Sequence, residues 1–198
     1  MKKWSEIKQA TLDKLFLTQS EAEQIGYLSK FRFLANEGLN IIANRVKPRI
    51  AVFEITTDKN GDVVEMPDDF LSFADITGFV DEKPETDVVY VSDRLVAFPT
   101  KGKHKVFYNA TWYYITEDDT KITAVTTEEK ELPIDISVIN CLPTYIASQI
   151  LAQDDIQRST VLKNEFELML AGLDTNIMYG ENHYRSIGGW YWWEKKNY

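Results

Sequence analysis

The spacing of apolar residues changes twice along the 198-residue chain, and this change constrains the fold more than any other feature. Between residues 21 and 46, apolar side chains recur at steps of three and four, the period of an amphipathic helix. They are Ile25, Leu28, Phe31, Ala35, Leu39, Ile42 and Val46. Residues 49–127 instead alternate and are rich in β-branched and aromatic residues, as antiparallel strands are. From residue 135 onward the helical period returns.

Two helices are predicted before the β-rich region. The first covers about residues 4–17, with Ser5 as its N-cap. The second covers about residues 21–46 and is capped by Thr18 or Ser20. Pro48 follows, and proline cannot continue a helix because it lacks a backbone N–H.

Turn signals divide the β-rich region into strands. Asn60-Gly61 is typical of a type I′ turn, which predicts a hairpin between the strands on either side. The segment "DVVYVSDRLVAFP" predicts a second strand pair that turns near Ser92-Asp93. The segment "KVFYNATWYYITEDDTKIT" predicts further strands with a turn at "EDDT".

The C-terminal helical part begins after the segment "TEEKELPID". Asp135 can cap a helix there, and Pro143 either lies in the first turn of a new helix or kinks the first one. Helical spacing then continues to Leu173. No periodicity is found from Asp174 to the end of the chain.

The order of these elements predicts an α+β fold. We expect a small helical bundle built from both chain ends, with helices over about 4–46 and 135–173. A central antiparallel β-rich insertion over about 49–127 projects from it. Residues 1–173 then form a single domain, and residues 174–198 form an extended C-terminal arm.

The composition is acidic, with 22 Lys and Arg against 31 Asp and Glu and a net charge of -9. Proteins neutralise DNA phosphates with Lys and Arg, so such a chain is a poor non-specific binder of nucleic acid. The one cysteine, Cys141, excludes an intrachain disulfide, and its apolar neighbours predict a buried side chain. No signal peptide is expected, and every apolar run is far shorter than the roughly 20 residues of a membrane span.

Residue types that carry catalysis or bind metals are sparse. Neither His104 nor His183 has a second His or a Cys at metal-ligand spacing. Adjacent aspartates point apart on a regular element and do not make a catalytic pair. The sequence therefore predicts no enzyme, no catalytic residue, no metal site and no cofactor.

A short basic segment, "TKGKHK", contains Lys101, Lys103, His104 and Lys105. We expect it to be a hairpin tip in which His104 is solvated. Its lysines either keep a sheet edge soluble or contact an acidic partner or a phosphate group.

Four stretches together resemble one family of proteins. They are "YLSKFRFLANEGLNIIANRVKP", "EMPDDFLSF" after the first predicted hairpin, "VFYNATWYYITEDDTKI", and the block "ELPIDISVINCLPTYIASQILAQDDIQRSTVLKNEFELMLAGL". Their combination resembles the head–tail connector (adaptor) proteins of tailed bacteriophages, especially those of phages and prophages of Gram-positive hosts. The resemblance spans roughly Trp4 to Leu173 and rests on apolar and turn residues.

The resemblance implies a structural virion protein, made in the bacterial cytoplasm and placed in the neck of the particle. Its subunits would form a ring, usually a dodecamer, that docks under the portal protein and extends the DNA channel. Its other partner would be a downstream tail protein or a second connector. DNA would pass through the lumen without specific binding, and no membrane would be involved. The acidity of the chain fits a channel to which DNA does not adhere.

A ring subunit makes head-to-tail contacts and needs two different contact surfaces. Phe33, Leu34 and Ile41 widen the apolar stripe of the second predicted helix, so they are candidates for one of these surfaces. Packing into the core of the subunit is the alternative for the same three residues.

The chain ends in "GGWYWWEKKNY", which places large aromatic side chains after a flexible Gly188-Gly189 joint. The aromatic candidates for partner binding are Tyr184, Trp190, Tyr191, Trp192 and Trp193. We expect an arm that docks on the portal or on a neighbouring subunit. Folding back onto the chain's own domain is one alternative, and a binding module for a carbohydrate or a peptide is another.

Overall fold

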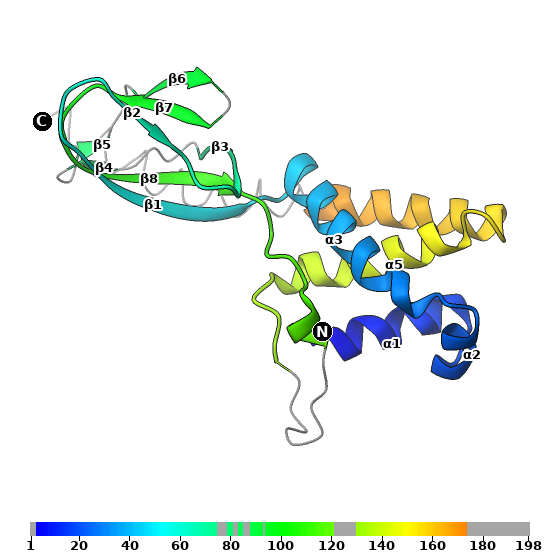
Figure 1. The fold of residues 1–198 in the computed structure, drawn as a ribbon. Helices are drawn as coiled ribbons and strands as arrows, with labels where there is room; N and C mark the ends of the chain where they lie inside the picture. Colours follow the sequence, from blue (N-terminus) through cyan, green and yellow to red (C-terminus); the bar gives the residue numbers. More distant parts are fainter. Residues whose placement is uncertain are drawn as a thin grey trace, which may run out of the picture. The chain divides into compact units, whose positions relative to one another are not determined.

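The structure, a computed structural model, describes residues 3–74, 79–80, 83–84, 88–92, 94–120 and 130–173. It combines helices with small antiparallel sheets, which confirms the α+β class (Figure 1). The chain divides into two compact units. We call residues 1–47 together with 113–198 the helical unit, and residues 48–112 the β unit.

The helical unit is built around α5, which packs against both α1 and α3. Every residue of α5 from Cys141 to Ser148 is buried, as expected for a helix that is apolar on all sides. The elements are α1 (Trp4–Leu15), α2 (Gln19–Gln24), α3 (Leu28–Arg45), α4 (Glu117–Thr120), α5 (Ile136–Leu151) and a last helix over residues 156–173. The predicted burial of Cys141 is confirmed, with 1% of the residue exposed.

The predicted caps are only partly correct. α1 starts at Trp4, so Ser5 is not the N-cap; Lys3 takes that place, and the Glu6 carboxylate accepts its backbone N–H at 3.2 Å. Thr18, one of the two predicted candidates, caps α2, because its hydroxyl oxygen accepts the Glu21 backbone N–H at 3.3 Å. Asp135 caps α5 as predicted, accepting the Ser137 backbone N–H at 2.7 Å.

The single helix predicted for residues 21–46 is wrong. α2 ends at Gln24 and α3 begins at Leu28. Gly26 lies between them with φ at +79°, a left-handed conformation that terminates helices and that glycine adopts without steric cost. The apolar spacing continues across this break, so periodicity alone does not reveal it.

Of the two alternatives predicted for Pro143, the start of a new helix is wrong, because α5 continues through this proline. Proline removes one helical hydrogen bond, yet burial of a helix against its neighbours supplies most of its stability. Here Pro143 and the residues on both sides of it are buried.

The described residues of the β unit form two three-stranded antiparallel sheets and one small strand pair. The first sheet has the order β1 (Arg49–Thr57), β8 (Gly102–Ala110), β3 (Phe70–Phe73). The second has the order β2 (Asp62–Glu65), β7 (Leu95–Phe98), β6 (Val89–Ser92), and β4 (Phe79–Val80) pairs with β5 (Lys83–Pro84). Eight buried residues of this unit form one cluster: Ala51, Met66, Phe70, Val96, Phe98, Val106, Tyr108 and Ala110.

The hairpin predicted at Asn60-Gly61 does not form, although the turn does. Gly61 has φ at +73°, but β1 pairs with β8 over nine residues and β2 pairs with β7. The turn therefore carries the chain from one sheet to the other, and the Gly61 N–H donates to the Phe98 carbonyl at 2.8 Å. The strand pair predicted for "DVVYVSDRLVAFP" is confirmed as β6 and β7.

The β-rich region is shorter than the predicted range of 49–127. β8 ends at Ala110, residues 111–116 have no regular structure, and the predicted turn "EDDT" forms the short helix α4. Asn36 on α3 binds the backbone of this segment as a neighbouring strand would. Its side-chain oxygen accepts the Ile115 N–H at 2.8 Å, and its side-chain N–H donates to the Ile115 carbonyl at 3.1 Å. Residues 121–129, which include the end of the predicted strand, lie outside the described residues.

Candidate functional site

The three candidates on α3 do not form one surface. Phe33 is 71% exposed, whereas Leu34 and Ile41 are half-buried. Leu34 and Ile41 are seven residues apart and share one side of the helix, while Phe33 is turned roughly 100° away from Leu34. α3 therefore offers a single exposed aromatic side chain together with two residues at the margin of the core.

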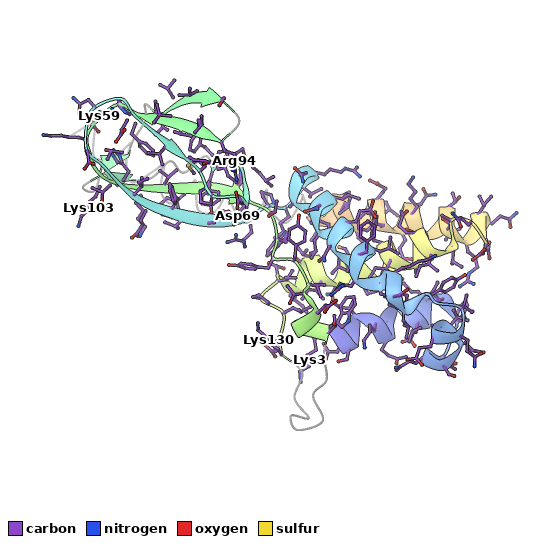
Figure 2. The ribbon with its side chains drawn as sticks, viewed as in Figure 1. Lys3, Lys59, Asp69, Arg94, Lys103 and Lys130 are labelled. Atoms are coloured by element: carbon purple, nitrogen blue, oxygen red, sulfur yellow. The ribbon has the colours of Figure 1, made fainter. Side chains whose placement is uncertain are left out.

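The two candidate lysines are exposed at one end of the first sheet of the β unit. Lys103 lies on β8 opposite Thr56, and the Lys101 backbone N–H donates to the Asn60 side chain at 2.9 Å. Figure 2 shows Lys59 and Lys103 at the same end of this unit. The predicted hairpin tip is therefore only partly correct: Lys101 precedes β8, whereas Lys103 lies within the strand, which begins at Gly102.

His104 is not the solvated loop residue that was predicted. Because β8 begins at Gly102, the strand alternation turns His104 inward, and only 2% of the residue is exposed. Its Nε2 lies 2.8 Å from the Thr57 hydroxyl oxygen, and its ring centroid lies 4.5 Å from that of Phe98. His104 therefore helps to hold β8 against β1 and lies away from the surface.

Ion pairs fix the opposite end of the first sheet. Arg49 at the start of β1 pairs with Asp69, which also accepts the Tyr108 hydroxyl at 2.8 Å. Arg49 Nε donates to the Thr111 carbonyl at 3.2 Å, so β1, the segment before β3 and the end of β8 are joined. Arg94 binds both Glu65 and Asp68, and Figure 2 labels Asp69 and Arg94. These ion pairs therefore stabilise the fold of the β unit.

Among the described residues of the helical unit, Cys141 and Tyr145 are buried ionisable groups. Burial raises the pKa of the Cys141 thiol to about 11, so the thiol is protonated at neutral pH and packs as a small apolar group. Burial, and then the nearby carboxylate of Glu37, raise the pKa of Tyr145. Within the part of the chain that the structure describes, no group of three or more His, Cys, Asp and Glu residues is arranged to hold a metal ion.

The helical unit has a groove that was not predicted from the sequence. The groove has a volume of about 600 Å³ and lies between the end of α1 and the start of the last helix. It is lined by Asp13, Lys14, Phe16, Gln157, Arg158, Val161 and Leu162. Its surface is mostly apolar, which is typical of a binding site.

Phe16 is the most exposed large apolar residue at this groove. It has a left-handed φ of 57° at the end of α1 and is 81% exposed, with the Arg158 guanidinium 4.6 Å above its ring centre. The sequence did contain a signal for this exposed residue: Phe16 is a large apolar residue that lies next to the stripe formed by Ile7, Thr11 and Leu15 but does not belong to it. Val161, which is 66% exposed, adds to the same surface from the last helix.

The aromatic candidates of the C-terminal arm lie outside the described residues. They are Tyr184, Trp190, Tyr191, Trp192 and Trp193. His183 lies there as well.

No known family of proteins matches this chain by its family model, and no curated protein matches it. Among the helices of the described ranges, none is at once long enough and apolar enough to cross a membrane.

Proposed function

We propose that this chain is a subunit of the head–tail connector of a tailed bacteriophage, placed in the neck of the virion beneath the portal. The observation that carries the proposal is the path of the chain. It leaves the helical unit after Lys47, forms the β unit over residues 48–112, and re-enters the helical unit at Tyr113. The connector family that the sequence resembles is expected to have this order, a helical bundle from both chain ends with a β-rich insertion.

The exposed apolar residues of the helical unit support assembly. A closed ring of identical subunits needs two different surfaces on each subunit that fit one another. Phe33 on α3 is a candidate for one of them, because its side chain is exposed in a single chain, where contact with water is unfavourable.

In this function the chain forms part of the wall of the DNA channel and catalyses no reaction. Its net charge of -9 repels DNA phosphates, so the genome can slide through the ring without binding to it. The proposed partners are further copies of the chain, usually twelve to a ring, the portal protein, and a downstream tail or second connector protein. The terminal arm with Trp190 to Trp193 is the proposed contact with the portal.

The test is to mix the purified chain with rings of its portal protein and to image the mixture by negative-stain electron microscopy. The proposal predicts an additional ring layer on one end of the portal. Native mass spectrometry then gives the number of copies. A chain that ignores the portal at every ratio tested contradicts the proposal.

The contribution of the arm is tested by deleting residues 188–198. The helical unit should keep its circular dichroism spectrum and its unfolding midpoint, while portal docking becomes weaker. If the deletion unfolds the protein, the arm belongs to the core instead. Phe33→Ser is a matched point variant, since Phe33 is exposed and its loss should impair ring closure without changing stability.

A further inference from the structure

The outward face of the last helix carries a stripe without charged residues, which we call the outer seam. Its members are all exposed: Gln157, Val161, Asn164, Leu168 and Ala171. They are spaced by four, three, four and three residues, the spacing at which one helix contacts another in a coiled coil. The opposite side of the same helix packs in the core of its own unit through Leu162, Phe166, Leu170 and Leu173.

Two residues of the outer seam are large and strongly exposed. Val161 is 66% exposed and Leu168 is 75% exposed. Single apolar residues are common on protein surfaces. Here the two are separated by two helical turns, about 10.5 Å along the axis, and they lie on one face.

The two ends of the seam differ in shape. Val161 borders the groove of about 600 Å³ that Phe16 and Leu162 also line. Leu168 lies two turns further on and projects from the same face. The helix therefore presents a depression near its start and a protruding apolar side chain in its second half.

The protruding side chain of one copy of this helix can fill the depression of a second copy. When two copies of the helix run antiparallel about a two-fold axis at Asn164, Leu168 of each copy meets the groove beside Val161 of the other. Asn164 then faces Asn164, and their amides can donate to and accept from one another. We propose that the outer seam binds the outer seam of a second copy of this chain in this antiparallel arrangement.

The charges beside the seam permit this contact. Glu165 and Glu167 flank it, and each is held by a cation of its own chain, Lys14 at 2.7 Å and Arg45 at 2.8 Å. Both glutamates therefore already have a cation as partner when the two seams meet. The net charge of -9 on each copy still opposes association at long range, so added salt should strengthen the dimer.

The size of the seam sets the expected affinity. From Gln157 to Ala171 it is about 21 Å long, and its large apolar side chains are Val161 and Leu168. Stable complexes bury about 800 Å² per partner. A contact limited to one face of one helix is smaller than this, so the predicted dimer is weak and should dissociate reversibly on dilution.

The first test is sedimentation velocity of the full-length chain alone over a range from about 10 µM to 1 mM. A reversible dimer that strengthens with salt is the predicted result. Leu168→Glu should weaken association at least tenfold, and Phe33→Glu, at an equally exposed apolar residue of another helix, should leave it unchanged. A chain that remains monomeric, or a dimer that persists in Leu168→Glu, overturns the proposal.

The second test fixes the direction of the two helices by disulfide trapping. Asn164→Cys should cross-link with itself, and Val161→Cys should cross-link with Leu168→Cys when the two variants are mixed. Lys163→Cys, exposed but outside the seam, is the control that should not cross-link. The native Cys141 is buried and does not interfere. Self-linking of Val161→Cys without the mixed product indicates parallel pairing and overturns the antiparallel arrangement.

The inference does not depend on the connector function. Both tests use the chain without its portal, so a dimer without portal binding refutes only the proposed function. Portal-bound rings from a chain whose seam neither dimerises nor cross-links refute only this inference.

Discussion

At the scale of single residues, close packing in the helical unit depends on one glycine. A Cβ atom on Gly38 of α3 would lie 2.9 Å from Tyr145 Cδ1 and 3.3 Å from Leu142 Cδ2, both on α5. Tyr145 has little room to move, because it is 5% exposed and its ring centroid lies 5.0 Å from that of Phe166. Gly38 thus sets how closely α3 approaches α5.

Gly38→Ala should destabilise the protein by about 1–2 kcal/mol, because overpacking exceeds the roughly 1 kcal/mol gained in helix propensity. Urea unfolding measures the change. Gly172→Ala is the matched control, since a Cβ on Gly172 meets no atom within 4 Å and its effect should be neutral or stabilising. A stable Gly38→Ala variant means that α3 and α5 lie further apart than described.

Cys141 provides a second prediction at this scale. Because burial raises the pKa of the thiol to about 11, the thiolate is scarce at neutral pH, and the side chain is 1% exposed. Ellman's reagent at pH 8 should therefore react with it only after unfolding in urea. Rapid reaction of the native protein contradicts the described position of Cys141 in α5.

At the scale of elements, one amide side chain attaches an irregular segment to α3. Asn36 makes both hydrogen bonds to the backbone of Ile115, which is 2% exposed. Asn36→Ala leaves the partly buried N–H and carbonyl of Ile115 without this partner. We expect a loss of about 1–3 kcal/mol in thermal or urea unfolding. Asn40→Ala, one turn later on α3, is the control and should cost less, since Asn40 accepts a hydrogen bond from the exposed side chain of Tyr114.

The N-cap of α5 gives a prediction on pH. Burial opposes ionisation of Asp135, but hydrogen bonds from Ser137 and Lys47 outweigh it and hold the pKa of Asp135 below its ordinary value. A carboxyl whose pKa is lower in the folded state adds stability above its unfolded pKa, and this is lost as the pH falls through the folded pKa. Between pH 7 and pH 2, Asp135→Asn should therefore lose less stability than the unaltered protein. Equal acid sensitivity of the two proteins contradicts the assignment.

Elements with strong local signals could be predicted from the sequence. Thr18 and Asp135 were identified as caps because their side-chain chemistry acts within three residues. The break at Gly26 was missed because apolar spacing continues across it. Gly61 was recognised as a turn residue, but strand pairing depends on segments far apart in the chain, and β1 pairs with β8, about 50 residues away.

Surface residues were the least predictable part of the candidate site. Of the α3 candidates only Phe33 is strongly exposed, while Phe16, Val161 and Leu168 were not selected. Exposure depends on which side of a helix its neighbours cover, and the sequence of one helix does not specify this. His104 shows the same effect, because its burial follows from the residue at which β8 begins.

At the scale of the whole molecule, the chain consists of a helical unit interrupted by a β unit. Such an insertion is tolerated because each unit has its own buried apolar residues. The proposed connector function rests on the exposed apolar residues of the helical unit and on the acidic charge of the chain.

Imaging the purified chain together with its portal rings tests the central claim most directly. The connector function predicts one extra ring of density, with the symmetry of the assembled subunits, at one end of the portal. Phe33→Ser and the deletion of residues 188–198 should each reduce its occupancy. Bare portal rings at saturating concentrations of a correctly folded chain would contradict the connector function.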